Sequence, residues 1–161
     1  LNSNIWKMYV FRFLINLHFF GGVLVPFFLD WGGISFTQLM MLQSFFVICI
    51  FLLEIPTGAI ADYVSRKASI ILSALVTAIA ILVYTSQPNF YIFLAGEFFW
   101  ALGFTLLSGA DEALIYDSLK KTKKEDKSKN VFGRYHGFEL TGLMIAAPIG
   151  SFIAAKCIPR N

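Results

Sequence analysis

The chain has 161 residues, of which 57% are hydrophobic, 17% are aromatic and 14% are charged, and its formal net charge is +3. The charged fraction is well below the roughly 25% of ordinary soluble domains, and a soluble chain of this length could not bury 18 Phe, 6 Tyr and 3 Trp in one core. The composition therefore excludes a soluble domain and a disordered chain, and it predicts an all-α polytopic membrane protein.

Five apolar runs are long enough to cross a bilayer core, which requires about 20 residues per helix. We expect transmembrane helices over residues 8–29, 36–59, 68–85, 90–114 and 131–155, joined by short connections and by a basic loop at 115–130. The first run carries Arg12 and is followed by no small-residue cleavage site, so it is expected to remain as a helix and not to be a signal peptide.

Most Lys and Arg residues near the span ends fall on one side of the membrane. The positive-inside rule therefore predicts a cytoplasmic N-terminus and basic loop, an external C-terminus, and a place in the cell membrane (the inner or plasma membrane). The residues on the cytoplasmic side are Lys7, Arg66, Lys67, Lys120, Lys121, Lys123, Lys124, Lys127, Lys129 and Arg134, and those outside are Lys156 and Arg160.

Aromatic residues are expected to form a belt at each interface, where their amphipathic rings lie among the lipid headgroups. The belts agree with the orientation set by the basic residues. The expected inner members are Trp6, Tyr9, Tyr116 and Tyr135, and the outer members are Trp31, Tyr84 and Tyr91.

Arg12 lies about one turn inside the first span, where a charge costs about 2.5 to 3.5 kcal/mol on insertion scales. Asn16 follows at i+4 and shares its face. At 1.5 Å per residue, Asp111 and Glu112 reach the same depth and Glu139 approaches it. We therefore expect an ion pair at this level; the alternative is that Arg12 extends to the lipid headgroups. Glu139 could also be satisfied by its helix neighbours Tyr135 and His136.

Polar residues of the fourth run share one face of a helix and are expected to line a cavity. Glu97 has no Lys or Arg at a comparable depth, so its carboxyl should be neutral part of the time. It is a candidate site for proton or cation coupling, and the alternative is a hydrogen bond between packed helices. The stripe comprises Glu97, Ala101, Ser108, Asp111 and Glu112.

Small residues recur every four positions in two of the runs, which is typical of close helix contacts in membranes. They are Gly142, Ala146, Gly150 and Ala154 in the fifth run and Ala101, Thr105, Gly109 and Ala113 in the fourth.

The turn between the second and third runs contains a recognisable motif. Gly58 is expected to let the chain turn tightly, Asp62 to cap the next helix or face a cation, and the basic pair Arg66 and Lys67 to hold the turn inside. This turn resembles the signature G-x-L-A-D-R-x-G-R-K of the major facilitator superfamily. The matches are Gly58, Ala61, Asp62, Arg66 and Lys67, with Ile60 in place of Leu, Tyr63 in place of the first Arg and Ser65 in place of the second Gly.

The resemblance implies the first five helices of a fold with two six-helix halves, so the chain is expected to be an N-terminal fragment. It also implies a secondary active transporter of a small solute with alternating access, whose partners are the substrate, lipids and the remaining half. Coupling to protons or another ion is expected from Glu97 and not from the resemblance. The alternative is a non-transporting scaffold or assembly subunit. No enzyme motif, metal-ligand spacing, cofactor motif or nucleic-acid site is expected.

The candidate residues form two groups. The substrate or coupling group comprises Arg12, Asn16, Glu97, Asp111, Glu112 and Glu139, and the cytoplasmic gate comprises Gly58, Asp62, Arg66 and Lys67.

Overall fold

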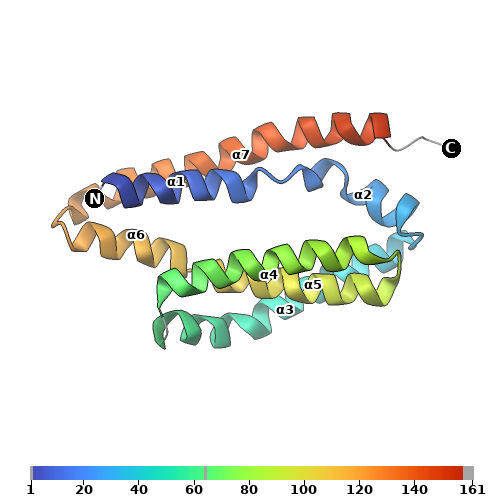
Figure 1. Ribbon diagram of the computed structural model, residues 1–161, viewed down its shortest axis with the longest axis horizontal. Coiled ribbons are helices and arrows are strands. Elements are labelled where there is room, and N and C mark those ends of the chain that lie inside the picture. The colour runs from blue at the N-terminus through green and yellow to red at the C-terminus, as the bar shows by residue number, and fades with distance from the viewer. Residues whose placement is uncertain (1, 64, 158–161) are drawn as a thin grey trace. The chain divides into compact units, whose positions relative to one another are not determined.

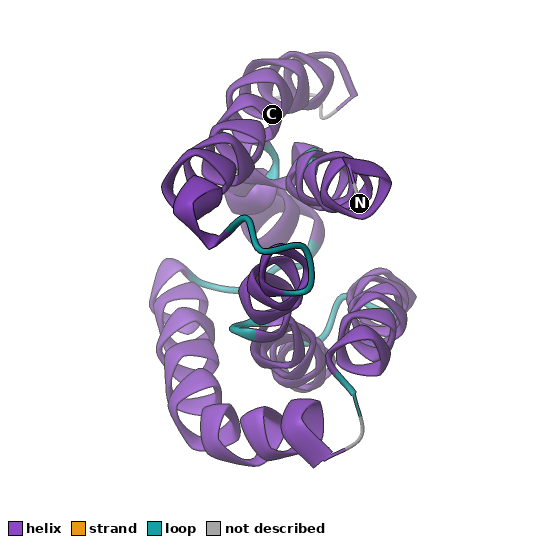
Figure 2. Cartoon of the chain, turned by 90° about the vertical axis from the view of Figure 1, so that its left-hand side faces the viewer, coloured by secondary structure: helices purple, strands orange, loops and turns teal. Residues whose placement is uncertain are grey.

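The computed structural model describes residues 2–63 and 65–157, and every regular element in these ranges is a helix. Figures 1 and 2 show helices joined by short loops, with no strand among the described residues. The chain forms two compact units: one contains Phe28–Leu114, and the other combines the segment before it with the segment from Ile115 onward. The all-α fold predicted from composition is confirmed.

Helices α3 (Phe36–Tyr63), α4 (Arg66–Ser86) and α5 (Phe90–Leu107) form the central unit. Helix α5 packs against both α3 and α4 (Figure 1). The Ser69 and Ser73 hydroxyls of α4 donate hydrogen bonds of 2.6 Å each to backbone carbonyls of α5, at Leu106 and Gly103. These bonds are buried, so they hold α4 and α5 at a fixed register in an apolar medium.

An aromatic cluster closes the end of this unit that the predicted orientation places outside. The ring of Phe28 meets those of Phe93 and Tyr84 edge to face, with centroids 5.0 and 5.9 Å away. Gly32 lies so close to Phe93 that a Cβ atom would come within 2.9 Å of the ring. The glycine therefore lets the chain before α3 pass over the cluster.

The fourth predicted run is broken near its C-terminal end. Helix α5 stops at Leu107 and α6 (Ala110–Lys120) begins after Gly109, whose φ of +75° lies in the left-handed region that glycine adopts without strain. The polar stripe predicted from Glu97 to Glu112 assumed one continuous helix. Because the helix is broken at Gly109, the residues before and after it do not follow one helical periodicity and do not form one continuous face.

The other unit pairs α1 (Asn2–Asn16) with α7 (Ser128–Cys157), and α7 also packs against a short 3₁₀ segment, η1 (Phe19–Gly22). Gly142, Ala146 and Gly150 are buried, as the four-residue repeat predicts. A Cβ atom on Gly142 would lie 2.8 Å from the Phe13 carbonyl oxygen, and one on Gly150 would press on the Phe19 carbonyl. These small residues allow the backbones to approach closely.

The first predicted run, 8–29, is helical only in pieces. After α1 and η1 come a single turn, α2 (Leu24–Pro26), and a π-helical turn, η2 (Phe27–Trp31). Gly21, Gly22 and Pro26 mark the interrupted stretch, because glycine lowers helix stability and proline removes a backbone donor. The irregular part of the predicted loop 115–130 is shorter than expected. Helix α6 extends into this range, η3 (Glu125–Lys127) lies within it, and α7 begins at its end.

Three helical stretches among the described residues are long and apolar enough to cross a membrane: Phe36–Tyr63, Arg66–Ser86 and Phe90–Lys120. They correspond to the second, third and fourth predicted spans. The first and fifth spans stay predictions.

The aromatic belts are only partly as predicted. Trp6 and Tyr91 are exposed, as belt residues should be. Tyr9, Tyr84 and Tyr135 were also assigned to the belts, but they are 6%, 5% and 0% exposed. Each packs between helices, because a tyrosine ring can be buried in a core when its hydroxyl has a hydrogen-bond partner.

The contact between α4 and α5 can be tested at Gly103. A Cβ atom there would lie 3.3 Å from the Ser73 carbonyl oxygen and closer still to the Thr77 hydroxyl, whereas one on Gly58 in α3 would meet nothing within 4 Å. Both Gly→Ala changes raise helix propensity by about 1 kcal/mol, but overpacking at Gly103 costs about 1–3 kcal/mol. We expect G103A to lower the midpoint of thermal unfolding in detergent and G58A to maintain or raise it. Equal shifts in the two variants would contradict the close contact.

Candidate functional site

Arg12 of α1 forms an ion pair with Glu139 of α7. The guanidinium nitrogen Nη2 lies 3.0 Å from the carboxylate oxygen Oε2, and the two side chains are 18% and 24% exposed. The ion pair predicted for Arg12 is therefore formed, and its partner is the carboxylate of the fifth run. Pairing offsets the cost of placing both charges inside a predicted span.

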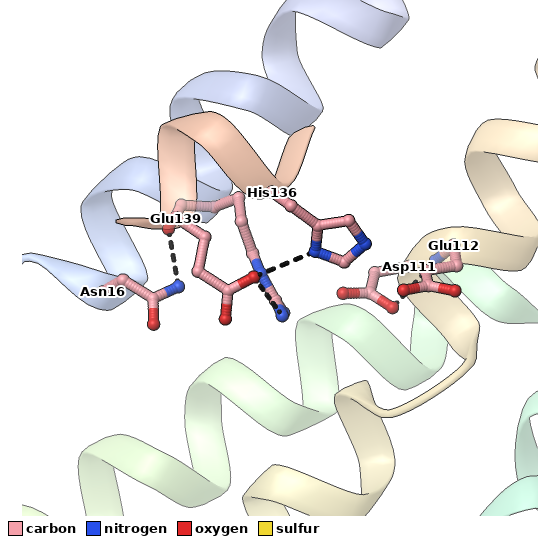
Figure 3. A network of polar contacts seen from close by, with 6 residues as sticks. Asn16, Asp111, Glu112, His136 and Glu139 are labelled. Carbon is pink, nitrogen blue, oxygen red and sulfur yellow. Dashed lines mark hydrogen bonds and ion pairs between the residues drawn. The ribbon is translucent and has the colours of Figure 1, made fainter. Parts of the chain in front are cut away.

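The same carboxylate oxygen contacts a second basic group. Nδ1 of His136, one turn earlier on α7, lies 3.2 Å from Oε2 of Glu139, and Figure 3 shows the imidazole ring facing this carboxylate. His136 was predicted as one local partner of Glu139, and this contact is confirmed. The imidazole is 49% exposed, so the cluster of Arg12, His136 and Glu139 is accessible from outside the protein.

Two neighbours position Arg12. The guanidinium carbon lies 5.1 Å from the ring centroid of Tyr135, which is fully buried. A cation over an aromatic face is stabilised by the ring quadrupole. Asn16, which was predicted to share the face of Arg12, donates 2.9 Å from Nδ2 to the Arg12 backbone carbonyl (Figure 3). Asn16 therefore adds a side-chain hydrogen bond to the last turn of α1.

Glu97 of α5 is 4% exposed, and its side-chain hydrogen-bond partner is Tyr84 of α4. Gly96 makes this contact possible, because a Cβ atom on it would come within 2.9 Å of the Tyr84 ring. The sequence placed Tyr84 at the membrane interface and missed it as a partner. The length of the tyrosine side chain could have indicated this partner, because the hydroxyl of Tyr84 can lie at a different membrane depth from its backbone. This geometry favours the alternative of a hydrogen bond between packed helices.

Asp111 and Glu112 lie in the first turn of α6, directly after Gly109. Asp111 is 3% exposed, and its Oδ1 accepts a 2.7 Å hydrogen bond from the Glu112 backbone N–H. Glu112 is exposed. Carboxylates in the first turn of a helix satisfy free N–H groups and complement the helix dipole. Both residues therefore have a structural role in starting α6.

The gate residues lie differently from the predicted turn. Gly58 and Asp62 are inside α3, so neither turns the chain, and the cap of α4 is Ser65, whose hydroxyl accepts from the Ala68 N–H at 3.1 Å. The predictions of a turn at Gly58 and a cap at Asp62 are wrong. Helix α3 continues through Pro56, and Thr57 Oγ1 in the next position donates 2.8 Å to the Leu53 carbonyl.

Arg66, in the first turn of α4, donates 2.9 Å from Nη1 to the backbone carbonyl of Ala113 in α6. Asp62 and Lys67 are exposed. The basic half of the motif thus holds α4 to the segment that follows the helix break. In the described part of the chain, no group of three or more His, Cys, Asp or Glu side chains could hold a metal ion.

A family model described as Major Facilitator Superfamily matches residues 8–157, nearly the whole chain. Comparisons with curated proteins and with solved structures give no match.

The ion pair can be measured by a double-mutant cycle. Arg12→Met leaves Glu139 without its guanidinium partner, and Glu139→Leu leaves Arg12 without its carboxylate. We expect each single change to cost about 1–3 kcal/mol of unfolding free energy, which is below the range for fully buried pairs because both side chains are partly exposed. The double variant should recover much of the loss. Additive losses in detergent unfolding would show that the two groups do not interact.

Proposed function

The chain belongs to the Major Facilitator Superfamily, a family of transporters and not of enzymes, and on this premise we propose that it serves proton-coupled secondary transport of a small solute across the cell membrane. The observation that carries the proposal is the carboxylate of Glu139, shared by Arg12 at 3.0 Å and His136 at 3.2 Å. The N-terminus is proposed to be cytoplasmic, in agreement with the distribution of basic residues.

The shared carboxylate provides a way to couple a proton to a solute. A proton taken up by Glu139 removes the negative charge that holds Arg12, and the guanidinium becomes available to an acidic group of a solute. Release of the proton restores the ion pair. Because the imidazole of His136 can both accept and donate a proton, it can deliver one to the carboxylate. A zwitterionic solute fits this exchange, and Asn16 would assist by fixing the turn that carries Arg12.

The remaining candidate carboxylates have smaller roles in the proposed transport. Glu97 is the second coupling candidate: the Tyr84 hydroxyl can donate to an ionised carboxylate and accept from a neutral one, so both forms keep a hydrogen bond. We propose that Asp111 and Glu112, in the first turn of α6, contact the substrate or the coupling ion.

The gate is proposed to comprise Gly58, Asp62, Arg66 and Lys67. Its support is the hydrogen bond from Arg66 to the Ala113 carbonyl, together with the exposure of Asp62 and Lys67, which leaves their charges available for contacts. Alternating access requires such contacts to form in one state and break in the other.

Coupling is tested with the protein expressed from its complete reading frame and reconstituted in vesicles. A thermal-stabilisation screen of cationic and zwitterionic compounds first supplies a solute. Glu139→Gln removes the exchangeable proton and keeps the shape of the side chain. We expect its solute uptake to become independent of an imposed pH gradient, whereas Glu97→Gln, which keeps a hydrogen bond to Tyr84, should respond to the gradient as the parent does. Loss of the response in Glu97→Gln alone would move coupling to Glu97.

The gate is tested at its basic residues. A hydrogen bond to a charged donor contributes about 1.5–3 kcal/mol, which corresponds to about a tenfold or greater change in an equilibrium between two states. We expect Arg66→Gln to change the uptake rate by about tenfold and the matched change Lys67→Gln, at an exposed position, to have a smaller effect. Equal effects would argue against a specific role for the Ala113 contact.

A further inference from the structure

Two hollows on the unit formed by α1 and α7 are not used by the proposed transport site. One has a volume of about 430 Å³ and the other of about 460 Å³, within the size range of small-molecule sites. Both are lined by Arg134. The first is completed by Ile5, Trp6, Tyr9 and Val131, and the second by Phe13, Gly137, Phe138 and Thr141.

The two hollows differ in chemistry. The first brings an indole, a phenol and the guanidinium together, which are groups that favour the headgroup layer of a membrane. The second is lined mainly by Phe13 and Phe138. The rings of Tyr9 and Phe138 are stacked, with centroids 5.3 Å apart and an interplanar angle of 12°. This stack joins the wall of the polar hollow to the wall of the apolar one.

The hollows also differ in depth along the helices. Thr141 lies seven residues beyond Arg134 on α7, and Phe13 lies seven beyond Trp6 on α1. Seven helical residues correspond to about 10 Å. In the predicted orientation, the polar hollow is at the cytoplasmic interface and the apolar hollow extends toward the bilayer centre. A ligand that fits both has a charged end and a hydrocarbon tail.

Arg134 provides the charge that such a ligand must complement. Its side chain is exposed, and it forms no hydrogen bond or ion pair with any other residue in the described ranges. Arg12 differs, because Glu139 neutralises it. The segment leading into α7 adds further positive charge, since six lysines lie within residues 120–129. The potential at this end therefore favours an anion.

We propose that the groove between α1 and α7 binds an anionic phospholipid, with the headgroup phosphate on Arg134 beside Trp6 and an acyl chain along Phe13. A guanidinium pairs with phosphate through two parallel hydrogen bonds. A soluble phosphate would fill only the polar hollow and leave the apolar one to other molecules. A phospholipid would occupy both hollows, and its headgroup would lie beside the exposed Trp6.

Photo-crosslinking tests the proposal with the protein expressed from its complete reading frame, in phosphatidylcholine vesicles. The probes are phosphatidylglycerol and phosphatidylcholine that carry the same photoactivatable acyl chain at a few mole per cent. Labelled peptides are identified by mass spectrometry. We expect the anionic probe to label residues 5–13 and 131–141 about fivefold more than the zwitterionic probe, as one specific basic contact predicts.

Matched variants separate a specific site from general attraction to the lysine-rich segment. Arg134→Gln should reduce labelling by phosphatidylglycerol to the level of phosphatidylcholine, Arg134→Lys should retain part of the preference, and Lys129→Gln, with the same loss of charge, should retain most of it. Parent-like elution of each variant from a sizing column establishes folding. Equal labelling by the two probes, equal losses in Arg134→Gln and Lys129→Gln, or full competition by soluble glycerol phosphate would overturn the proposal. Absence of label from both segments would show that another part of the protein covers the groove, which would also overturn it.

Discussion

Every polar group that this chain places in lipid must find its partner within the protein, because a hydrocarbon medium supplies no hydrogen bonds. The constraint explains which side chains face inward. Ser69 and Ser73 donate to carbonyls of the neighbouring helix, and Arg12 lies against Glu139. Residues that a soluble protein would direct to water are here the fixed points between helices. Apolar side chains then fill the remaining surface, which is why large hydrophobic residues of α3 such as Phe51 and Ile55 are exposed.

Side chains at the start of α4 satisfy backbone groups at the break between α5 and α6. The break at Ser108–Gly109 ends one helix and starts another, so carbonyl groups before it and N–H groups after it lack partners within a helix. Ser69 reaches the Leu106 carbonyl before the break, and Arg66 reaches the Ala113 carbonyl after it. Both donors lie within one turn of the same helix. The basic motif therefore has a structural consequence in addition to its predicted part in orientation: Arg66 stabilises the backbone where α5 is followed by α6.

The sequence was informative where one physical rule dominated and less so where two rules competed. Hydropathy identified the spans of α3, α4 and α5, and the four-residue spacing identified Gly142 and Gly150 as contacts, since each follows from a single periodicity. The charge of Arg12 required a partner, and depth limited the choice to a few carboxylates. The break at Gly109 was missed because an apolar run reads the same whether its helix is continuous or interrupted. Tyr84 was misassigned because its ring suits both an interface and a core, and only the nearby Gly96 decides between them.

The face that α7 turns toward α1 changes in character along its length. Tyr135, Glu139, Gly142, Ala146 and Gly150 follow one another at spacings of three or four, so they form a single stripe. The stripe begins with a fully buried aromatic ring, continues with an ion pair, and ends with small residues that lie against the backbone at Phe13 and Phe19. Backbones can come close only where the side chains are small. Larger side chains fill the contact at the end that carries Tyr135, and the hollows lined by Arg134 lie along that part of α7. The gradient of residue size along α7 thus runs from the hollows toward the close contact.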